Sequence, residues 1–139
     1  EQAERMFSAF SGKLPLLVHA GDARYPYSNP SRIARMMDRF PEMRVIAAHM
    51  GGYSEWDEAA RTLAGRKNLY VDLSSTMFSM TDGEIVREIR LFGADRVMFA
   101  SDSPMWSPAG ELKRVLGLRL TQEEGEEVLS GTARAFLGI

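Results

Sequence analysis

The stretch RVIAAHMGG (Arg44–Gly52) combines a short apolar run with a histidine at its end and two glycines directly after it. The run is too short for a core helix, is rich in β-forming residues and is bounded by charge and glycine, so it predicts a buried parallel strand. Runs of the same character occur at LPLLVHA (Leu14–Ala20), NLYVDLSS (Asn68–Ser75) and RVMFASD (Arg96–Asp102). The four runs predict four parallel strands.

Segments with helical periodicity separate these runs. After the first run, PSRIARMMDRFPEM has Pro30 and Ser31 as a start signal and Pro41 as a stop. After the second, SEWDEAARTLAGRKN has Ser54 as its expected N-cap, and TDGEIVREIRLFGAD repeats the scheme after the third. Further helices are expected at Gln2–Phe10, near Pro108–Leu116 and at Thr121–Leu137, the last opening with the capping-box pattern TQEE.

The order of these elements predicts the fold class. The strand starts recur every ~25–30 residues, the length of one βα unit, and no linker or low-complexity tract interrupts them. We therefore expect a single α/β domain over residues 1–139. Two architectures compete, an open doubly wound sheet and a (β/α)8 barrel. No Gly-rich phosphate loop follows any strand, which counts against a nucleotide-binding sheet, although open sheets without nucleotides exist.

The composition excludes several classes of partner and chemistry. The chain has 139 residues, of which 45% are hydrophobic and 26% charged, with a net charge of −2. This near-neutral balance argues against nucleic acid or a membrane surface as a partner. The absence of cysteine removes disulfides, thiol nucleophiles and Cys-ligated zinc, and fits the cytoplasm. No membrane-length apolar run or signal peptide is present, and a chain that begins at Glu1 is expected to be a processed product or a piece of a longer one.

Polar side chains gather at the predicted carboxyl ends of the strands. His19 ends the first strand, His49 ends the second, and Asp102 lies in SDSP at the end of the fourth. Each has a structural explanation of its own: a satisfied core histidine, or an aspartate that forms a turn or an N-cap. Their equivalent positions in three βα units favour a shared site instead, because active sites are built at that edge in barrels and open α/β sheets.

These residue types suit metal-assisted chemistry. Imidazole and carboxylate hold Zn²⁺ or a similar divalent ion while leaving a position open for water. The bound ion lowers the pKa of that water, and a nearby His or Asp takes its proton. Two histidines and one aspartate are fewer ligands than such sites usually recruit, so further ligands are expected from elsewhere.

Three other residues are weaker candidates, for substrate binding. Arg24 and Tyr27 lie in the long loop after the first strand, where an arginine can pair with a substrate carboxylate; the alternative is a solvated loop. Trp106 follows the fourth strand and can line a pocket. Asp72, inside the third strand, is expected to have a structural role, and Trp56 is expected to pack its helix on the sheet.

Taken together, LPLLVHAGD, VIAAHMGG, LYVDLSS, VMFASDSPM and the closing EEVLSGTARAFLGI resemble successive blocks of the metal-dependent amidohydrolase family 2. This family includes hydrolases, lactonases and aminocarboxymuconate- or resorcylate-type decarboxylases. The likeness covers nearly the whole chain in order, and the combination of H-x-G, A-H-x-G-G and S-D-x-P is specific. The family pattern G-N-x-x-R is altered near the end, where Thr132 replaces the Asn and the Arg falls one place early, at Arg134.

The resemblance implies roles for the strand-end residues, because members of the family are (β/α)8 barrels with one metal ion. His19 would be a metal ligand from the fifth barrel strand. His49 would lie on the sixth strand beside the metal-bound water, which it would activate, or it would polarise the substrate. Asp102 would be a metal ligand or proton acceptor at the end of the eighth. Zinc is the expected metal, with manganese or iron as alternatives.

The chain lacks the H-x-H metal motif of the family's first strand. Four strands are visible where a barrel needs eight, and a typical barrel runs to ~250 residues. We therefore expect the C-terminal half of a (β/α)8 TIM barrel: four parallel βα units, equivalent to strands 5–8, plus a C-terminal helix. Unpaired edges on the first and fourth strands predict pairing with a second copy or with the missing N-terminal half, or poor behaviour of the chain alone.

Two hypotheses about function follow. The leading one is an enzyme that hydrolyses, or non-oxidatively decarboxylates, a small carboxylated substrate with a metal-activated water. Both chemistries use the same metal layout, so the choice between them stays open. The alternative is a catalytically silent half-barrel that serves as an assembly or interaction module. A doubly wound sheet with a different ligand ranks below both.

Overall fold

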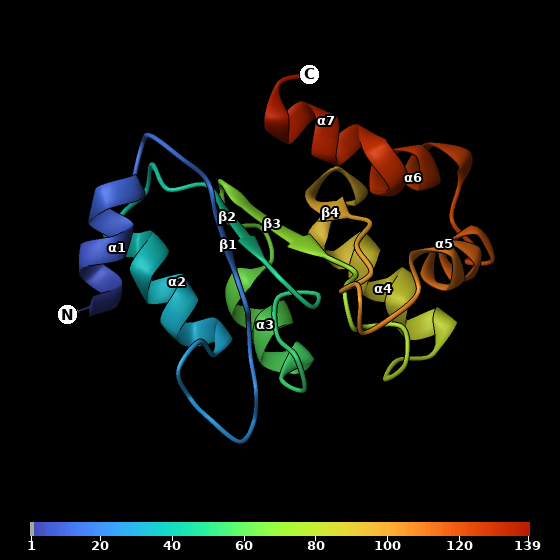
Figure 1. Cartoon of the computed structure of the whole chain (residues 1–139), viewed down its shortest axis with the longest axis horizontal. Coiled ribbons are helices and arrows are strands. Elements are labelled where there is room, and N and C mark those ends of the chain that lie inside the picture. Colours follow the sequence, from blue (N-terminus) through green and yellow to red (C-terminus); the bar gives the residue numbers. More distant parts are fainter. Residues whose placement is uncertain (1) are drawn as a thin grey trace.

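In the computed structural model, which describes residues 2–139, the four predicted strands form one parallel sheet in the order β1-β2-β3-β4. The strands are β1 (Leu16–Val18), β2 (Val45–Ala47), β3 (Leu69–Asp72) and β4 (Val97–Met98). Each strand pairs with the next one along the chain, and every pair is parallel. Parallel neighbours need a crossover connection, and here each crossover contains a helix (Figure 1).

The strands are shorter than the apolar runs that predicted them. His49 (φ 61°), Met50 (φ 53°) and Asp102 (φ 58°) adopt the left-handed conformation. An extended strand cannot continue through that conformation; β2 ends at Ala47, shortly before His49, and β4 already ends at Met98. The prediction that His49 and Asp102 end their strands is therefore corrected: both lie beyond the strand ends, whereas His19 directly follows the last residue of β1.

The predicted helices are present, with two corrections in detail. They are α1 (Gln2–Phe10), α2 (Pro30–Arg39), α3 (Trp56–Leu63), α4 (Asp82–Phe92), α5 (Pro108–Leu116), α6 (Gln122–Glu126) and α7 (Thr132–Leu137). Ser54 is not the N-cap of α3, because Glu55 holds that position, without a capping bond. The Ser54 hydroxyl instead accepts a hydrogen bond from the Ala23 N–H (3.0 Å).

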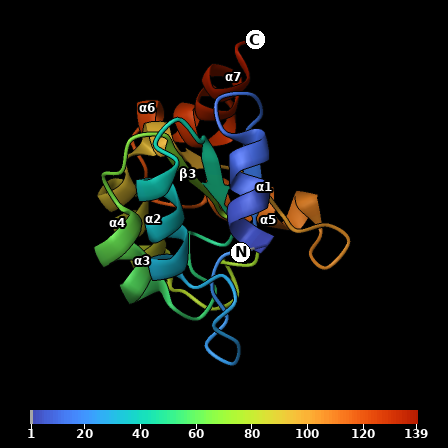
Figure 2. The same ribbon diagram turned by 90° about the vertical axis from the view of Figure 1, so that its left-hand side faces the viewer.

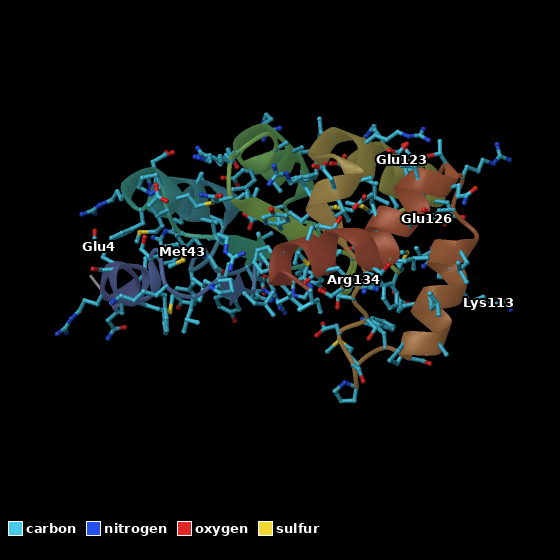
Figure 3. All side chains as sticks on the ribbon, turned by 90° about the horizontal axis from the view of Figure 1, so that it is seen from above. Glu4, Met43, Lys113, Glu123, Glu126 and Arg134 are labelled. Atoms are coloured by element: carbon cyan, nitrogen blue, oxygen red, sulfur yellow. The ribbon has the colours of Figure 1, made fainter. Side chains whose placement is uncertain are left out.

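The expected single helix at residues 121–137 is interrupted by a π turn, Glu127–Gly131, between α6 and α7. The Val128 carbonyl accepts a hydrogen bond from the Phe99 N–H (2.8 Å), just after β4, and a donor from outside that enters the helical ladder widens it locally. The capping box predicted at Thr121 is confirmed, with Glu124 as its partner. Figure 3 shows Arg134 on α7 beyond the interruption.

Helices bury one face of the sheet, whereas part of the other face is exposed to solvent. Helices α2, α3 and α4 lie on one side of it (Figure 2). The side chains that face them are fully or almost fully buried: Val45, Ala47, Leu69 and Val71. On the other face, Leu17 pairs in register with Ile46 and is 64% exposed. Strands β1 and β4 each have a neighbour on one side only. No helix among residues 2–139 is both long and apolar enough to cross a membrane.

Candidate active site

His49 is held by its backbone in the turn after β2. Its N–H donates to Asp72 Oδ1 (3.1 Å), and its carbonyl accepts from the indole Nε1–H of Trp56 (3.0 Å). The next N–H, of Met50, donates to the carbonyl of Asp72 (2.6 Å). These bonds satisfy a turn that contains two consecutive non-glycine residues in the left-handed region, a conformation that persists where the surroundings impose it. Only 7% of His49 is exposed.

Both ring nitrogens of His49 have partners. Nδ1 lies 3.0 Å from the Ser74 carbonyl oxygen and 2.9 Å from the Ser74 hydroxyl. Nε2 lies 2.8 Å from Nδ1 of His19, and the two rings meet edge to face with centroids 4.6 Å apart. His19 itself is exposed, in the turn after β1. The two histidines predicted from the sequence are therefore in direct contact.

Asp102 belongs to a second hydrogen-bonded group. Its Oδ2 accepts from the Ser75 hydroxyl (2.6 Å), which in turn accepts from the indole Nε1–H of Trp106 (3.1 Å). Ser75 (φ 51°) is left-handed like Asp102, and the peptide bond Ser103–Pro104 is cis. Ser74 and Ser75 thus serve different strand-end residues: Ser74 contacts His49, and Ser75 contacts Asp102.

A row of aromatic side chains joins the two groups. Tyr53 lies 5.9 Å from the His49 ring and 6.3 Å from the Phe78 ring, and Phe78 stacks on Trp106 at 5.0 Å, all between centroids. Half of Phe78 is exposed, so this aromatic row borders the solvent next to the histidines. Trp106, predicted as a pocket residue, is part of the row.

In the loop after β1, the side chain of Arg24 bonds to a residue of the same loop. Arg24 donates to Asp22 through Nε (3.0 Å) and Nη2 (2.8 Å). These bonds lower the pKa of Asp22 to about 2 and raise the pKa of Arg24. Tyr27 is 79% exposed and stacks on Tyr25. Arg24 and Tyr27 therefore have local partners here rather than contacts with the histidine pair.

The imidazole and carboxylate groups at the strand ends are suitable ligand types for a divalent metal, but they are not arranged around a common point. Imidazole and carboxylate suit zinc, manganese or iron. Among residues 2–139, however, no group of three or more His, Asp or Glu side chains is placed to hold an ion. Nε2 of His49 is bonded to His19, and Asp102 is bonded to Ser75. The described strand-end side chains therefore do not form a complete metal site.

A polar groove lies elsewhere on the molecule. It has a volume of about 430 Å³ and runs between α3 and α4, with Trp56, Met80 and Glu88 in its walls. It contains none of the predicted site residues. We place the candidate active site at the strand ends, because that is where imidazole, carboxylate and backbone groups in the left-handed conformation converge.

The sequence did not predict the parts that Ser74, Ser75, Tyr53 and Phe78 have in the site, nor the bond from Trp56 to His49. Asp72 was expected to have a structural role, and its carboxylate accepts a hydrogen bond from the His49 backbone N–H. The sequence did contain a local signal for the contact between Asp72 and Ser74. In DLS, an aspartate two residues before a serine is a pattern in which the side chain accepts the following N–H groups, and here Asp72 accepts from the Ser74 N–H (3.0 Å).

Comparison with known proteins gives both a family and a fold. The family model described as amidohydrolase matches residues 9–139. A search of curated protein sequences found no match. An uncharacterised TIM-barrel protein from Bordetella bronchiseptica superposes with a TM-score of 0.83 at 22% identity, covering 96% of this chain and 49% of that one.

Two further solved structures have assigned names. 5-Carboxyvanillate decarboxylase LigW from Sphingomonas paucimobilis gives a TM-score of 0.68 at 18% identity, covering 96% of this chain and 52% of that one. An amidohydrolase from Burkholderia multivorans with bound zinc gives 0.75 at 17% identity, covering 98% and 57%. The chain therefore folds as part of a TIM barrel and spans about half the length of these structures.

Proposed function

The chain belongs to the amidohydrolase family, and from this premise we propose that it contributes to a metal-dependent hydrolase or decarboxylase of small carboxylated substrates. The observation that carries the proposal is the contact between His49 Nε2 and His19 Nδ1 (2.8 Å), at the edge of a parallel sheet where barrel enzymes build their sites. A buried imidazole whose other nitrogen is fixed is suited to accept and return a proton at one defined position.

We assign His19 and Asp102 to metal binding, with further ligands from outside this chain. When bound, a divalent ion such as zinc supplies a Lewis acid that lowers the pKa of coordinated water. The Burkholderia amidohydrolase was solved with zinc, which supports this choice of metal. His49 then handles the proton, because its Nε2 faces His19 while its Nδ1 is bonded to Ser74.

The exposed aromatic row suits a flat, carboxylated substrate. Phe78 and Trp106 stack with their rings 24° from parallel and border the solvent. We assign Trp106 to substrate packing. Arg24 and Tyr27 are assigned to the substrate carboxylate, which requires Arg24 to exchange Asp22 for the substrate as its partner. LigW is named as a decarboxylase of a carboxylated aromatic acid, which supports this substrate class.

Metal titration tests the proposal on the 139-residue chain. Calorimetry with Zn²⁺ and with Mn²⁺ is expected to detect binding, weakened at least about tenfold in His19→Ala and in Asp102→Ala, because each removes a ligand. Tyr25→Ala, in the same exposed loop as Arg24, is the matched control and is expected to bind as the parent does. If neither ion binds, and His19→Ala changes nothing, the enzyme hypothesis fails for this chain.

Carbon dioxide release distinguishes the two reactions. The chain supplied with a complementary barrel half from a family member, zinc and carboxylated aromatic acids should release CO₂ if it is a decarboxylase. Hydrolysis of lactones without CO₂ release would instead identify a hydrolase. In either case, His49→Ala should abolish turnover while leaving zinc binding measurable.

The second candidate is an assembly module, favoured by the open edge of β1 and the 64% exposure of Leu17. We propose that a second copy or the complementary barrel half covers this face. Sedimentation of the chain alone should show self-association, reduced in Leu17→Lys but not in Leu137→Lys, which changes an equally exposed leucine on α7. A monodisperse, stable monomer would contradict this candidate.

A further inference from the structure

We propose that Asp72 and Ser74, at the end of β3, are positioning residues that fix the proton of His49 on Nδ1. The functional importance of this rests on the enzyme proposed above, but the proton placement follows from the hydrogen bonds alone. Neither residue needs to touch a substrate or a metal; both act through the imidazole of His49.

The first step is an inventory of donors and acceptors around Nδ1. The Ser74 carbonyl oxygen, 3.0 Å away, can only accept a hydrogen bond. The Ser74 hydroxyl, 2.9 Å away, has already directed its hydrogen to Asp72 Oδ1, so its oxygen offers only lone pairs to the ring. Nδ1 therefore faces two acceptors. The neutral ring must carry its hydrogen there and leave its lone pair on Nε2.

The second step extends the same reasoning to His19. Because Nε2 of His49 carries the lone pair, Nδ1 of His19 must be the donor across the 2.8 Å contact. Both rings are then protonated on Nδ1, and the lone pair of His19 lies on its outer nitrogen. One tautomer choice at Ser74 thus sets the basic nitrogen of both histidines, as outer partners of ligating histidines generally do.

The third step explains why Asp72 is needed. Its Oδ1 accepts from the His49 N–H (3.1 Å), the Ser74 N–H (3.0 Å) and the Ser74 hydroxyl. One buried oxygen therefore holds the turn after β2, the turn after β3 and the hydroxyl orientation. Without Asp72, the Ser74 hydroxyl is free to rotate and donate to Nδ1, which would move the ring hydrogen to Nε2.

Side-chain ¹⁵N NMR of the metal-free chain at alkaline pH, where imidazoles are neutral, tests the proposal. Protonated and unprotonated ring nitrogens differ strongly in ¹⁵N shift, so the spectrum reports the tautomer directly. The parent chain is expected to have His49 protonated on Nδ1. Asp72→Ala should shift the tautomer ratio toward Nε2–H by about fivefold, the effect of one net hydrogen bond, whereas Asp72→Asn, which keeps the accepting oxygen, should not.

A double variant separates positioning from loss of structure. Asp72→Ala with Ser74→Ala removes the competing hydroxyl donor, leaves the carbonyl acceptor and should return His49 to the Nδ1–H form. Ser74→Ala alone should keep that form, and Ser79→Ala, in an exposed serine of the same loop, is the matched control. If Asp72→Ala does not fold, Ser74→Ala and Asp72→Asn still test the assignment.

Protonation of His49 on Nε2 in the parent chain, or an unchanged tautomer in a folded Asp72→Ala, would overturn the proposal. The measurement uses no metal and no substrate. A chain that fails to bind zinc but shows these tautomers refutes the proposed function alone, and the reverse result refutes only the positioning roles.

Discussion

At the starts of the strands, the guanidinium of Arg44 lies 4.7 Å from the ring centroid of Phe136 and donates to the Phe136 carbonyl (2.7 Å). The same ring packs edge to face on Tyr70 at 4.7 Å, and Arg96 lies over Tyr70 at 5.0 Å. At the opposite end of the same sheet, the side chains of the turns are histidine, aspartate and serine. One end is closed by aromatic and cationic groups, and the other is lined with groups that carry lone pairs.

The difference indicates that the two ends of the sheet have separate roles, one in stability and one in positioning polar side chains. The aromatic and cationic groups at the strand starts pack on one another, which stabilises the fold, and a guanidinium has no lone pair with which to accept a proton. At the strand ends, His49, Ser75 and Asp102 adopt the left-handed region, a conformation that costs free energy for non-glycine residues. Such a cost is maintained where positioned side chains serve a function, so mutations at the two ends should have separable effects.

The largest expected effect is at the strand starts. Phe136 is buried, and Phe136→Ala removes its contacts with Tyr70 and Arg44, which should lower the free energy of unfolding by ~3–5 kcal/mol. Urea unfolding followed by circular dichroism measures it. Leu137→Ala, its exposed neighbour, should change stability by less than ~0.5 kcal/mol. If the variant still folds, its histidine NMR signals should be unchanged; altered tautomers would contradict the separation of the two ends.

A smaller loss of stability, with a direct effect on the site, is expected from Gly21→Ala. A Cβ at Gly21 (φ 78°) would lie 2.6 Å from the backbone N and O of Tyr53, so the turns after β1 and β2 would have to separate. The left-handed conformation alone costs ~1–2 kcal/mol, and the clash adds to it. Unfolding and the His19 and His49 NMR signals should change together. Gly12→Ala (φ 71°), with open space around it, is the control for the conformational cost.

Much of the fold could be predicted, because local patterns and topology agree. Apolar runs separated by capped helices specify four βα units, and consecutive parallel strands joined by helices have few alternative orders. Helices with strong capping signals, such as the one at Thr121, began where expected. The misassigned Ser54 shows the limit of this reasoning. Its hydroxyl bonds to Ala23, 31 residues away, and a single-sequence pattern has no access to that contact.

For the candidate site, the sequence predicted which residues lie together better than it predicted their hydrogen-bond partners. The sequence predicted that His19, His49 and Asp102 gather at equivalent strand ends, and in the structure His19 and His49 are in contact. The partners Ser74 and Ser75 could not be assigned to His49 and Asp102 from the sequence. Adjacent serines in one turn point to different neighbours according to backbone conformation, and Ser75 is left-handed.

The smallest expected effect is a change in the pH dependence of the free energy of unfolding, tested on one ion pair at each end of the sheet. Near the strand starts, two hydrogen bonds from Arg90 (2.7 and 3.0 Å), aided by the Thr121 N–H, lower the pKa of Glu124 from 4.5 to about 2. Near the strand ends, Arg24 lowers the pKa of Asp22 from 3.8 to about 2. A carboxyl with a lowered pKa in the folded state stabilises above its unfolded pKa and loses that contribution as the pH falls through the folded value.

Stability should therefore decline from about pH 4.5 to pH 2, and Glu124→Gln should reduce that slope more than Asp22→Asn does. Arg90 and Glu124 are 34 residues apart and meet only in the folded chain. Asp22 and Arg24 are two residues apart and can also pair when unfolded, which reduces the difference between the two states. Urea unfolding at pH 2–6 measures both slopes. Glu123→Gln, on the exposed surface of α6 (Figure 3), is the control. If Glu124→Gln and the parent lose stability with the same slope, the Arg90–Glu124 pair does not stabilise the fold.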